Sequence, residues 1–254
     1  MSSVQAQYTR EKNICSSLAC IEILVNVFPC GDVVVKVPFD AAHAIEAVTI
    51  DVAIAPFVRA LGVRAPELIA FDDSRSVLPV PFAIFRRVQL CPALDRVTGQ
   101  PAADQAAWEA VGRQLAIVHA VQMPERGQPD GGQQRVDPYG RTPCPPTAAP
   151  ANVLVDARSG RFRALIDWAG AGWIDPAWDF AAVSLDLVPF ILNGHRGVAP
   201  LANDDTAEAR ICWCQIQMRL YFVRHASLDE LLTERLARDI GQLRRFARES
   251  GLHG

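Results

Sequence analysis

The sequence predicts an α+β protein with two lobes, a strand-rich lobe over residues 1–88 and a mainly helical lobe over residues 89–254. β-Branched residues are concentrated in the first part, where one helical pattern interrupts them. Apolar residues at helical spacing dominate the second part, which contains one isolated hairpin pattern. Half of the chain is hydrophobic, which is enough for a sizeable core. In two-lobed proteins, binding sites commonly lie between the lobes.

The strand-rich part begins with a predicted β-hairpin. Residues 21–28 and 33–37 are apolar runs, and the Pro-Cys-Gly-Asp sequence of residues 29–32 separates them as a turn. Two more strands are predicted at residues 67–71 and 80–88, with the sequence Asp-Asp-Ser as the turn between them. The first lobe therefore consists mainly of strands.

One helix is predicted between these two pairs of strands. Asp40 is the predicted N-cap, because its carboxylate can accept a hydrogen bond from the first turn. Ile45, Val48 and Val52 then recur at helical spacing. Pro56 is expected to kink the helix or to end it, since proline lacks the amide hydrogen that a helix interior needs.

The second lobe begins with a predicted helix that Asp104 caps and that ends near His119. Its apolar positions recur at helical spacing and are Trp108, Val111, Leu115 and Val118. Residues 124–150 are crowded with Pro, Gly, Gln and Thr, which predicts a long loop. Loops of this length are usually functional or disordered, and this one can order against another protein chain.

A second hairpin and two helices follow the loop. Residues 152–156 and 162–168 are two short strand patterns joined by an Arg-Ser-Gly turn. Helices are predicted at residues 206–225 and 228–249, the second opened by a Ser-Leu-Asp-Glu capping box and closed by Gly251. Their predicted core-facing positions are Ile211, Gln215, Met218, Phe222, Leu232, Leu236, Ile240 and Leu243.

Charge and hydropathy exclude several classes of function. The net charge is −3 with acids and bases well mixed, so no basic stripe is present to bind a nucleic acid. The longest apolar stretches, residues 21–27 and 183–192, are too short or too interrupted to span a bilayer, and no export signal is present. We therefore expect a cytoplasmic protein with no membrane or nucleic-acid partner.

The cysteines and lysines limit the kinds of site that the protein can contain. The seven cysteines form no CxxC pair, and Cys212 and Cys214 would point to different faces of a helix, which argues against zinc and disulfides. Of the 25 basic residues, only Lys12 and Lys36 are lysine. The position of Lys36 within an apolar strand is therefore informative.

Three segments contain residues suited to phosphoryl transfer. Lys36 lies in a predicted strand, and the helix that follows offers Glu46 and Asp51 as acidic partners for a buried ammonium. The second hairpin can bring the amide of Asn152 close to the carboxylate of Asp167, although both residue types also commonly cap turns. Oxygen ligands of this kind suit Mg²⁺, and lysine suits a phosphate.

At these positions the sequence resembles the aminoglycoside phosphotransferase and choline kinase family, which has a bilobal protein-kinase-like fold. Lys36 matches the β3 lysine of the family, and residues 61–66, Leu-Gly-Val-Arg-Ala-Pro, match its link after the αC helix. Residues 112–119 match its "LGxxLAxLH" helix. The sequence Ile-Asp-Trp that contains Asp167, with residues 172–181, is similar to the family's "IDWxxAxxGDPAxDLA".

The resemblance implies a nucleotide site with ATP or GTP and Mg²⁺. Asp51 would take the place of the αC glutamate, and Asn152 and Asp167 would be the metal ligands. Asp175 and Asp179 would brace the fold. The implied nucleotide contacts are Lys36, Asp51, Ser16, Ser17 and Val88.

The catalytic loop departs from the family pattern. The family reads "HGDLHPxN", whereas residues 145–152 read Pro-Pro-Thr-Ala-Ala-Pro-Ala-Asn, so Thr147 occupies the position of the catalytic aspartate. A neutral threonine cannot accept the proton of the acceptor hydroxyl. Asp137 could fold back as a substitute, but the spacing does not require it. In the phosphate-covering loop, Ser16 and Ser17 replace the usual glycines.

Two hypotheses of different class follow. The first is a phosphotransferase that acts on a hydroxyl of a small molecule, such as an antibiotic or other secondary metabolite, or of a peptide, with impaired or altered catalysis. The second is a pseudokinase, a scaffold or regulatory subunit of a biosynthetic complex without phosphotransfer. Fold alone does not decide between them.

Overall fold

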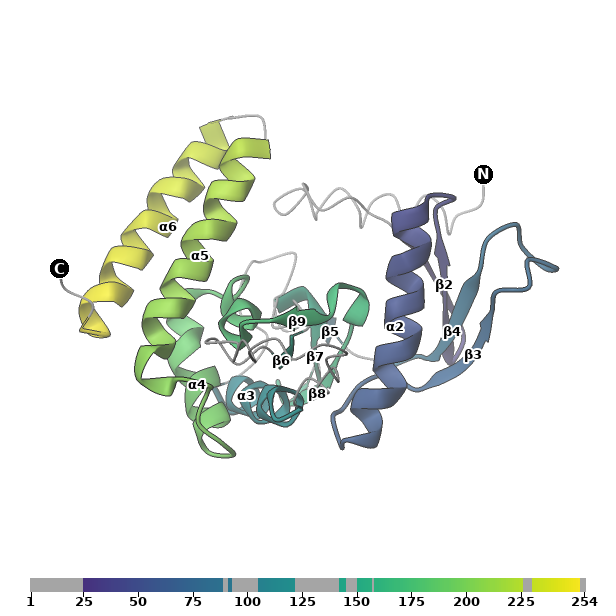
Figure 1. Cartoon of the computed structure of the whole chain (residues 1–254), viewed down its shortest axis with the longest axis horizontal. Coiled ribbons are helices and arrows are strands. Elements are labelled where there is room, and N and C mark those ends of the chain that lie inside the picture. Colours follow the sequence, from purple (N-terminus) through teal and green to yellow (C-terminus); the bar gives the residue numbers. More distant parts are fainter. Residues whose placement is uncertain are drawn as a thin grey trace, which may run out of the picture.

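The computed structural model describes residues 25–88, 91–92, 105–121, 142–144, 150–156, 158–225 and 230–251. In Figure 1 a sheet and helix α2 (Ala42–Ala60) form one part of the molecule, and helices α3 to α6 belong to the other. The predicted α+β class is confirmed. The lobe boundary at residue 88 stays a prediction.

The sheet of the first lobe is antiparallel, with the strand order β1-β2-β4-β3. Its strands are β1 (Val25–Cys30), β2 (Val33–Pro38), β3 (Leu68–Asp72) and β4 (Phe82–Arg86). The hairpin turn is shorter than predicted, because β1 continues through Pro29 and Cys30. Gly31 adopts φ +60°, a conformation that favours glycine and permits a tight hairpin turn.

Helix α2 differs from the prediction at both ends. Its N-cap is Ala41 rather than Asp40, and no side chain caps it. The helix does not end at Pro56 but continues to Ala60. Burial of Ala55 and Val58 on either side of the proline offsets the one backbone hydrogen bond that proline removes.

Helix α3 (Gln105–His119) packs against helix α4 (Val188–Arg196), which the sequence pattern did not predict. Two glycines allow the backbones to approach. A Cβ atom on Gly112 would overlap the carbonyl of Ile191, and one on Gly194 would overlap the backbone of Glu109. Trp108, Val111, Leu115 and Val118 of α3 are buried as predicted.

The predicted second hairpin is formed by strands β7 (Val153–Val155) and β8 (Phe162–Leu165). β7 also pairs with β5 (Cys91–Pro92), and β6 (Thr142–Cys144) pairs with β9 (Gly172–Ile174). The short helical turns of this lobe are η1 (Pro150–Asn152), η2 (Trp168–Gly170), η3 (Pro176–Phe180), η4 (Leu185–Leu187) and η5 (Asp204–Thr206).

The chain ends in helices α5 (Ala207–His225) and α6 (Glu230–Glu249), and Gly251 follows with φ +72°. The first three residues of the predicted capping box lie outside the described residues. Ile211 and Gln215 are buried as predicted, and the predicted positions Met218 and Leu243 pack against the core. Ile240 of α6 is exposed, contrary to the prediction, and Phe246 of the same helix is buried. No described helix is long and apolar enough to cross a membrane.

The two lobes share one continuous core, which includes Val48 and Phe85 from the first lobe and Leu165 and Trp168 from the second. The segment around Arg64 connects them. Its backbone N–H donates to Gln114 Oε1 at 2.7 Å, and its carbonyl accepts from Leu165 N at 2.8 Å. This segment fixes the second hairpin against the first lobe.

Candidate active site

Lys36 lies on the central strand β2 and points toward the junction of the lobes. Its Nζ is 2.5 Å from Asp51 Oδ2 and 3.9 Å from Asp167 Oδ1. It also lies 5.5 Å from the centre of the Phe85 ring. The ammonium is held by these contacts, and the side chain as a whole is 18 % exposed.

Asp51 joins three elements with its two carboxylate oxygens. It lies on the buried face of α2, where its side chain is 4 % exposed. Oδ2 accepts from Lys36, and Oδ1 accepts from the backbone N–H of Trp168 at 3.0 Å. A carboxylate that is buried needs such donors. Asp51 therefore connects β2 and α2 to the start of η2.

Asp167 has a left-handed backbone conformation, with φ 68° and ψ 64°. This conformation costs roughly 1–2 kcal/mol for a residue other than glycine. The flanking amides are both held, since Ile166 N–H donates to the carbonyl of Asn152 at 2.9 Å and Trp168 N–H donates to Asp51. The side chain is 55 % exposed and forms the accessible part of the cluster.

The charges in the cluster shift the pKa values of two groups. Desolvation acts to lower the pKa of Lys36, but the charges of Asp51 and then Asp167 outweigh it, so this pKa is raised. Desolvation and repulsion from Asp51 raise the pKa of Asp167, although Lys36 offsets part of this effect. Ionised Asp167 is therefore a site where a cation is favourable.

Of the other candidate residues, two belong to the part of the chain that the structure describes, and four do not. Asn152 ends η1 beside the hairpin, and no hydrogen bond to its side chain is formed within the described residues. Val88 follows β4 at the junction of the lobes and is half-buried. Ser16, Ser17, Asp137 and Thr147 lie outside the described residues.

Sequence reasoning missed the backbone N–H of Trp168, which is a partner of Asp51. A backbone donor carries no sequence signature, and only the motif around Asp167 drew attention to this turn. Within the described residues, no three His, Cys, Asp or Glu side chains are grouped for a metal ion. A metal at Asp167 would therefore need ligands beyond side chains of these types.

Residues 24–141 and 148–205 match a model of the phosphotransferase enzyme family, and together they are more than half of the chain. The chain belongs to this family. The match is interrupted at residues 142–147, which include Thr147. The resemblance to the aminoglycoside phosphotransferase family that the motifs indicated is thereby confirmed. A search of curated proteins found no match.

Solved structures of similar fold are also phosphotransferases. The GDP complex of an aminoglycoside 2'-phosphotransferase is 14 % identical to this chain in sequence, with a TM-score of 0.56. The alignment covers 95 % of this chain and 98 % of that chain. A gentamicin complex of another aminoglycoside phosphotransferase is 11 % identical, with a TM-score of 0.57 and coverages of 96 % and 97 %. A macrolide 2'-phosphotransferase from Brachybacterium faecium is 16 % identical, with a TM-score of 0.52 and coverages of 85 % and 87 %.

These likenesses confirm the bilobal kinase-like fold of this phosphotransferase-family protein. The sheet and α2 form the smaller lobe, and the helices α3 to α6 form most of the larger one. Lys36, Asp51 and Asp167 therefore lie where the two lobes meet.

Proposed function

We propose that this protein binds a nucleoside triphosphate, ATP or GTP, together with Mg²⁺ between its lobes. We further propose that it acts on a hydroxyl group of a small molecule, an antibiotic or other secondary metabolite, or of a peptide. One observation carries the proposal: the carboxylate of Asp51 contacts both Lys36 and the amide beside Asp167. The ammonium that we propose binds phosphate and the carboxylate that we propose binds the metal are 3.9 Å apart.

The donor set fits Mg²⁺, a hard cation that prefers oxygen ligands and keeps several waters. Asp167 and Asn152 would hold the ion, and the raised pKa of Asp167 supports a role in binding a cation. When bound with a nucleotide, Mg²⁺ would neutralise the charge on the phosphate oxygens. Asp51 would keep Lys36 charged and oriented, and Val88, Ser16 and Ser17 would contribute contacts to the nucleotide.

We propose that catalysis is weak, because Thr147 stands in the position of the catalytic aspartate. Phosphoryl transfer depends mostly on positioning and electrostatics, so a slow reaction does not require the base. Removal of a general base typically reduces a rate by about 10²–10⁴-fold. Cellular ATP and Mg²⁺ make the cytoplasm the expected compartment.

The second candidate function is a pseudokinase that binds a partner without phosphotransfer. The interruption of the family match at residues 142–147 favours it, because this interval contains the altered catalytic position. Residues 124–150 would then be the contact with a protein partner.

Nucleotide binding tests the site. We expect ATP with Mg²⁺ to raise the melting temperature of the wild type, since a ligand of the folded state stabilises it. Lys36→Ala and Asp167→Asn should each abolish the shift, whereas Glu46→Gln, an exposed acid on α2, should retain it. No shift at millimolar nucleotide would contradict the proposal.

Restoring the acid tests the proposed cause of weak catalysis. We expect Thr147→Asp to increase the rate of nucleotide hydrolysis or phosphoryl transfer by at least tenfold. Thr147→Asn introduces the uncharged isostere of aspartate and should leave this rate unchanged. If both variants bind nucleotide and neither gains activity, the pseudokinase function is favoured.

A further inference from the structure

The aromatic ring of Phe85 is a neighbour of the Lys36 ammonium to which the proposed function assigns no role. Lys36 Nζ lies over this ring, 5.5 Å from its centre. An ammonium within about 6 Å of the centre of an aromatic ring is attracted by the negative face of the π system. Phe85 therefore joins Asp51 as a group that stabilises this cation.

The register of the sheet explains why the two side chains meet. Val34 of β2 lies opposite Phe85 of β4. Lys36, two positions further along β2, lies opposite Ala83. Side chains two positions apart on a strand point to the same face, so Lys36 and Phe85 are diagonal neighbours on one face of the sheet. Asp51 approaches this face from helix α2, which packs on both strands.

The ring of Phe85 has a fixed position of its own. Its side chain is 4 % exposed and belongs to the core that the two lobes share. Strand β4 pairs with β2 on one side and with β3 on the other, where Leu68 lies opposite Phe85. Because a packed core leaves little free space, the ring cannot move aside. It is a rigid wall against which the ammonium of Lys36 lies.

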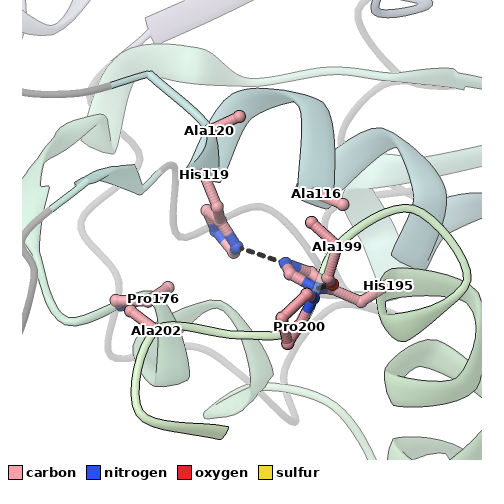
Figure 2. Close-up of a pocket in the computed structure, with 8 residues that line it drawn as sticks. All are labelled: Ala116, His119, Ala120, Pro176, His195, Ala199, Pro200 and Ala202. Carbon is pink, nitrogen blue, oxygen red and sulfur yellow. Dashed lines mark hydrogen bonds between the residues drawn. The ribbon is translucent and has the colours of Figure 1, made fainter.

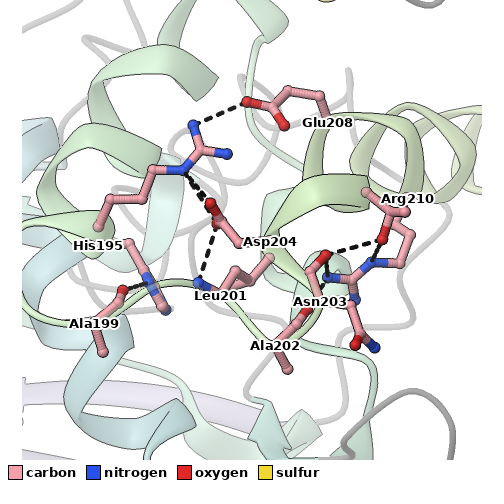
Figure 3. Close-up of polar contacts among 10 residues, drawn as sticks. His195, Ala199, Leu201, Ala202, Asn203, Asp204, Glu208 and Arg210 are labelled. Carbon is pink, nitrogen blue, oxygen red and sulfur yellow. Dashed lines mark hydrogen bonds and ion pairs between the residues drawn. The ribbon is translucent and has the colours of Figure 1, made fainter.

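Lys36 has fewer close acceptors than a well-anchored arginine of the larger lobe. Arg210 on α5 contacts Asp175 at 2.5 Å and donates to the carbonyl oxygens of Ala202 and Asn203 (Figure 3). Lys36 Nζ is within hydrogen-bond distance of Asp51, whereas Asp167 at 3.9 Å is beyond it. A lysine ammonium is a point charge on a flexible stem, so one close acceptor leaves it free to pivot. The ring limits this movement.

An aromatic residue suits position 85 better than an aliphatic one. Burial acts to lower the pKa of Lys36, because a charge is unfavourable in apolar surroundings. An aliphatic side chain would exclude water from the ammonium without attracting it. The face of an aromatic ring excludes water and also attracts the cation.

The buried histidines of the larger lobe do not offer another cation for a phosphate. His119 at the end of α3 and His195 on α4 point toward one another beside a cavity of about 60 Å³ (Figure 2). Desolvation lowers the pKa of His119 to about 3 and that of His195 to about 4, so neither ring is charged at neutral pH. The cavity is also far smaller than ligand pockets, which have volumes of roughly 300–1,000 Å³. The positioning of Lys36 is therefore what matters for a phosphate.

We propose that Phe85 is a positioning residue for nucleotide binding: together with Asp51, its ring holds the ammonium of Lys36 where the ammonium meets a phosphate. The consequence for phosphate rests on the proposed nucleotide site, whereas the ring holds the ammonium without a ligand as well. Phe85 acts through Lys36, because its own side chain is buried.

Fluorinated phenylalanines at position 85 test the contribution of the ring face. Each fluorine withdraws electron density from the face and leaves the shape of the side chain almost unchanged. We expect the dissociation constant of ATP with Mg²⁺, measured by calorimetry, to rise with each fluorine. For the trifluorinated ring it should be about three- to tenfold higher than for phenylalanine. If the wild type binds ATP and all fluorinated variants bind it equally well, the proposal is overturned and the proposed function stands.

Phe246 is the matched control for this series. It is also a buried phenylalanine, 6 % exposed, but it belongs to α6, which lies far from β4 in Figure 1. The same fluorinated residues at position 246 should leave the dissociation constant unchanged. An equal rise at both positions would overturn the proposal, because the effect would then be a general one of fluorine in the core.

NMR of the ligand-free protein tests the hold on the ammonium independently of nucleotide binding. The chain has two lysines, so ¹³C-labelled lysine gives two sets of side-chain signals, and Lys36→Arg identifies one of them. Protons that lie over an aromatic ring are shifted upfield by its ring current. We expect this upfield shift for the Cε protons of Lys36 in the wild type and its loss in Phe85→Leu. Identical Lys36 signals in the two proteins would overturn the proposal.

Discussion

At the scale of single residues, Asp51 is the group on which the candidate site depends most. Lys36, Asp51 and Asp167 were all predicted from motifs, because charged residues in apolar elements are conspicuous in a sequence. The contact of Asp51 with the amide of Trp168 was not predictable, since it requires that α2 and η2 pack together. Asp51 thus orients the lysine and also holds the left-handed turn at Asp167.

Replacement of Asp51 by asparagine should destabilise the protein by about 2 kcal/mol, less than the 3–5 kcal/mol typical of a broken buried pair, because Lys36 is partly exposed. Chemical denaturation measures this change. We expect the variant also to lose the stabilisation by ATP with Mg²⁺. Glu46→Gln, which removes an exposed acid of the same helix, should alter neither quantity.

The two buried histidines predict loss of stability in acid. Their folded pKa values of about 3 and 4 lie below the ordinary value of 6.5, so their contribution is complete above pH 6.5 and is lost as pH falls. Each histidine should contribute about 1.4 kcal/mol per pH unit between pH 6.5 and 4. In His195→Gln the slope of unfolding free energy against pH should decrease by that amount. An unchanged slope in His195→Gln would contradict the prediction.

At the scale of elements, the sequence predicted long periodic segments well and short or uniformly apolar ones poorly. Helix α3 shows a regular apolar stripe, and it was predicted with its buried positions. Helix α4 has only nine residues and was missed, because its stretch carries Pro189 and Gly194. Its existence depends on tertiary contact with α3, which local propensity does not contain.

The α3–α4 contact predicts that a side chain at Gly112 destabilises the protein, whereas one at a glycine outside the contact does not. Gly112→Ala would place a Cβ against the backbone of Ile191 and should destabilise the protein by about 2–3 kcal/mol, as overpacking does. Gly241→Ala, at an exposed position of α6, meets no atom and should stabilise the protein by up to about 1 kcal/mol through helix propensity. Denaturation of both variants gives the comparison, and equal effects would argue against the close packing.

At the scale of the whole molecule, the two lobes are joined by a shared core and by hydrogen bonds of the segment around Arg64. The bilobal arrangement followed from composition and motifs. The hydrogen bond between Arg64 and Gln114 that joins the lobes was not predictable. The two residues are 50 positions apart in the sequence, and neither residue type indicates a contact.

A shared core predicts that the lobes unfold together. Near-UV and far-UV circular dichroism should give coincident transitions in denaturant. Gln114→Ala removes the acceptor for Arg64 N–H and should lower stability by about 1 kcal/mol, whereas Gln105→Ala, at an exposed site on α3, should have little effect. Two separate transitions in the wild type would show that the core does not couple the lobes.

The scarcity of lysine gives the molecule a built-in chemical label. Lys36 is the single lysine among the described residues, and the whole chain has one other, Lys12. Its paired ammonium, with a raised pKa, should resist acylation by a free reagent, whereas an acyl phosphate of a nucleotide bound at the proposed site would place its reactive carbon beside that amine. Peptide mapping after such labelling should therefore yield one dominant modified fragment, and unlabelled ATP should compete it away.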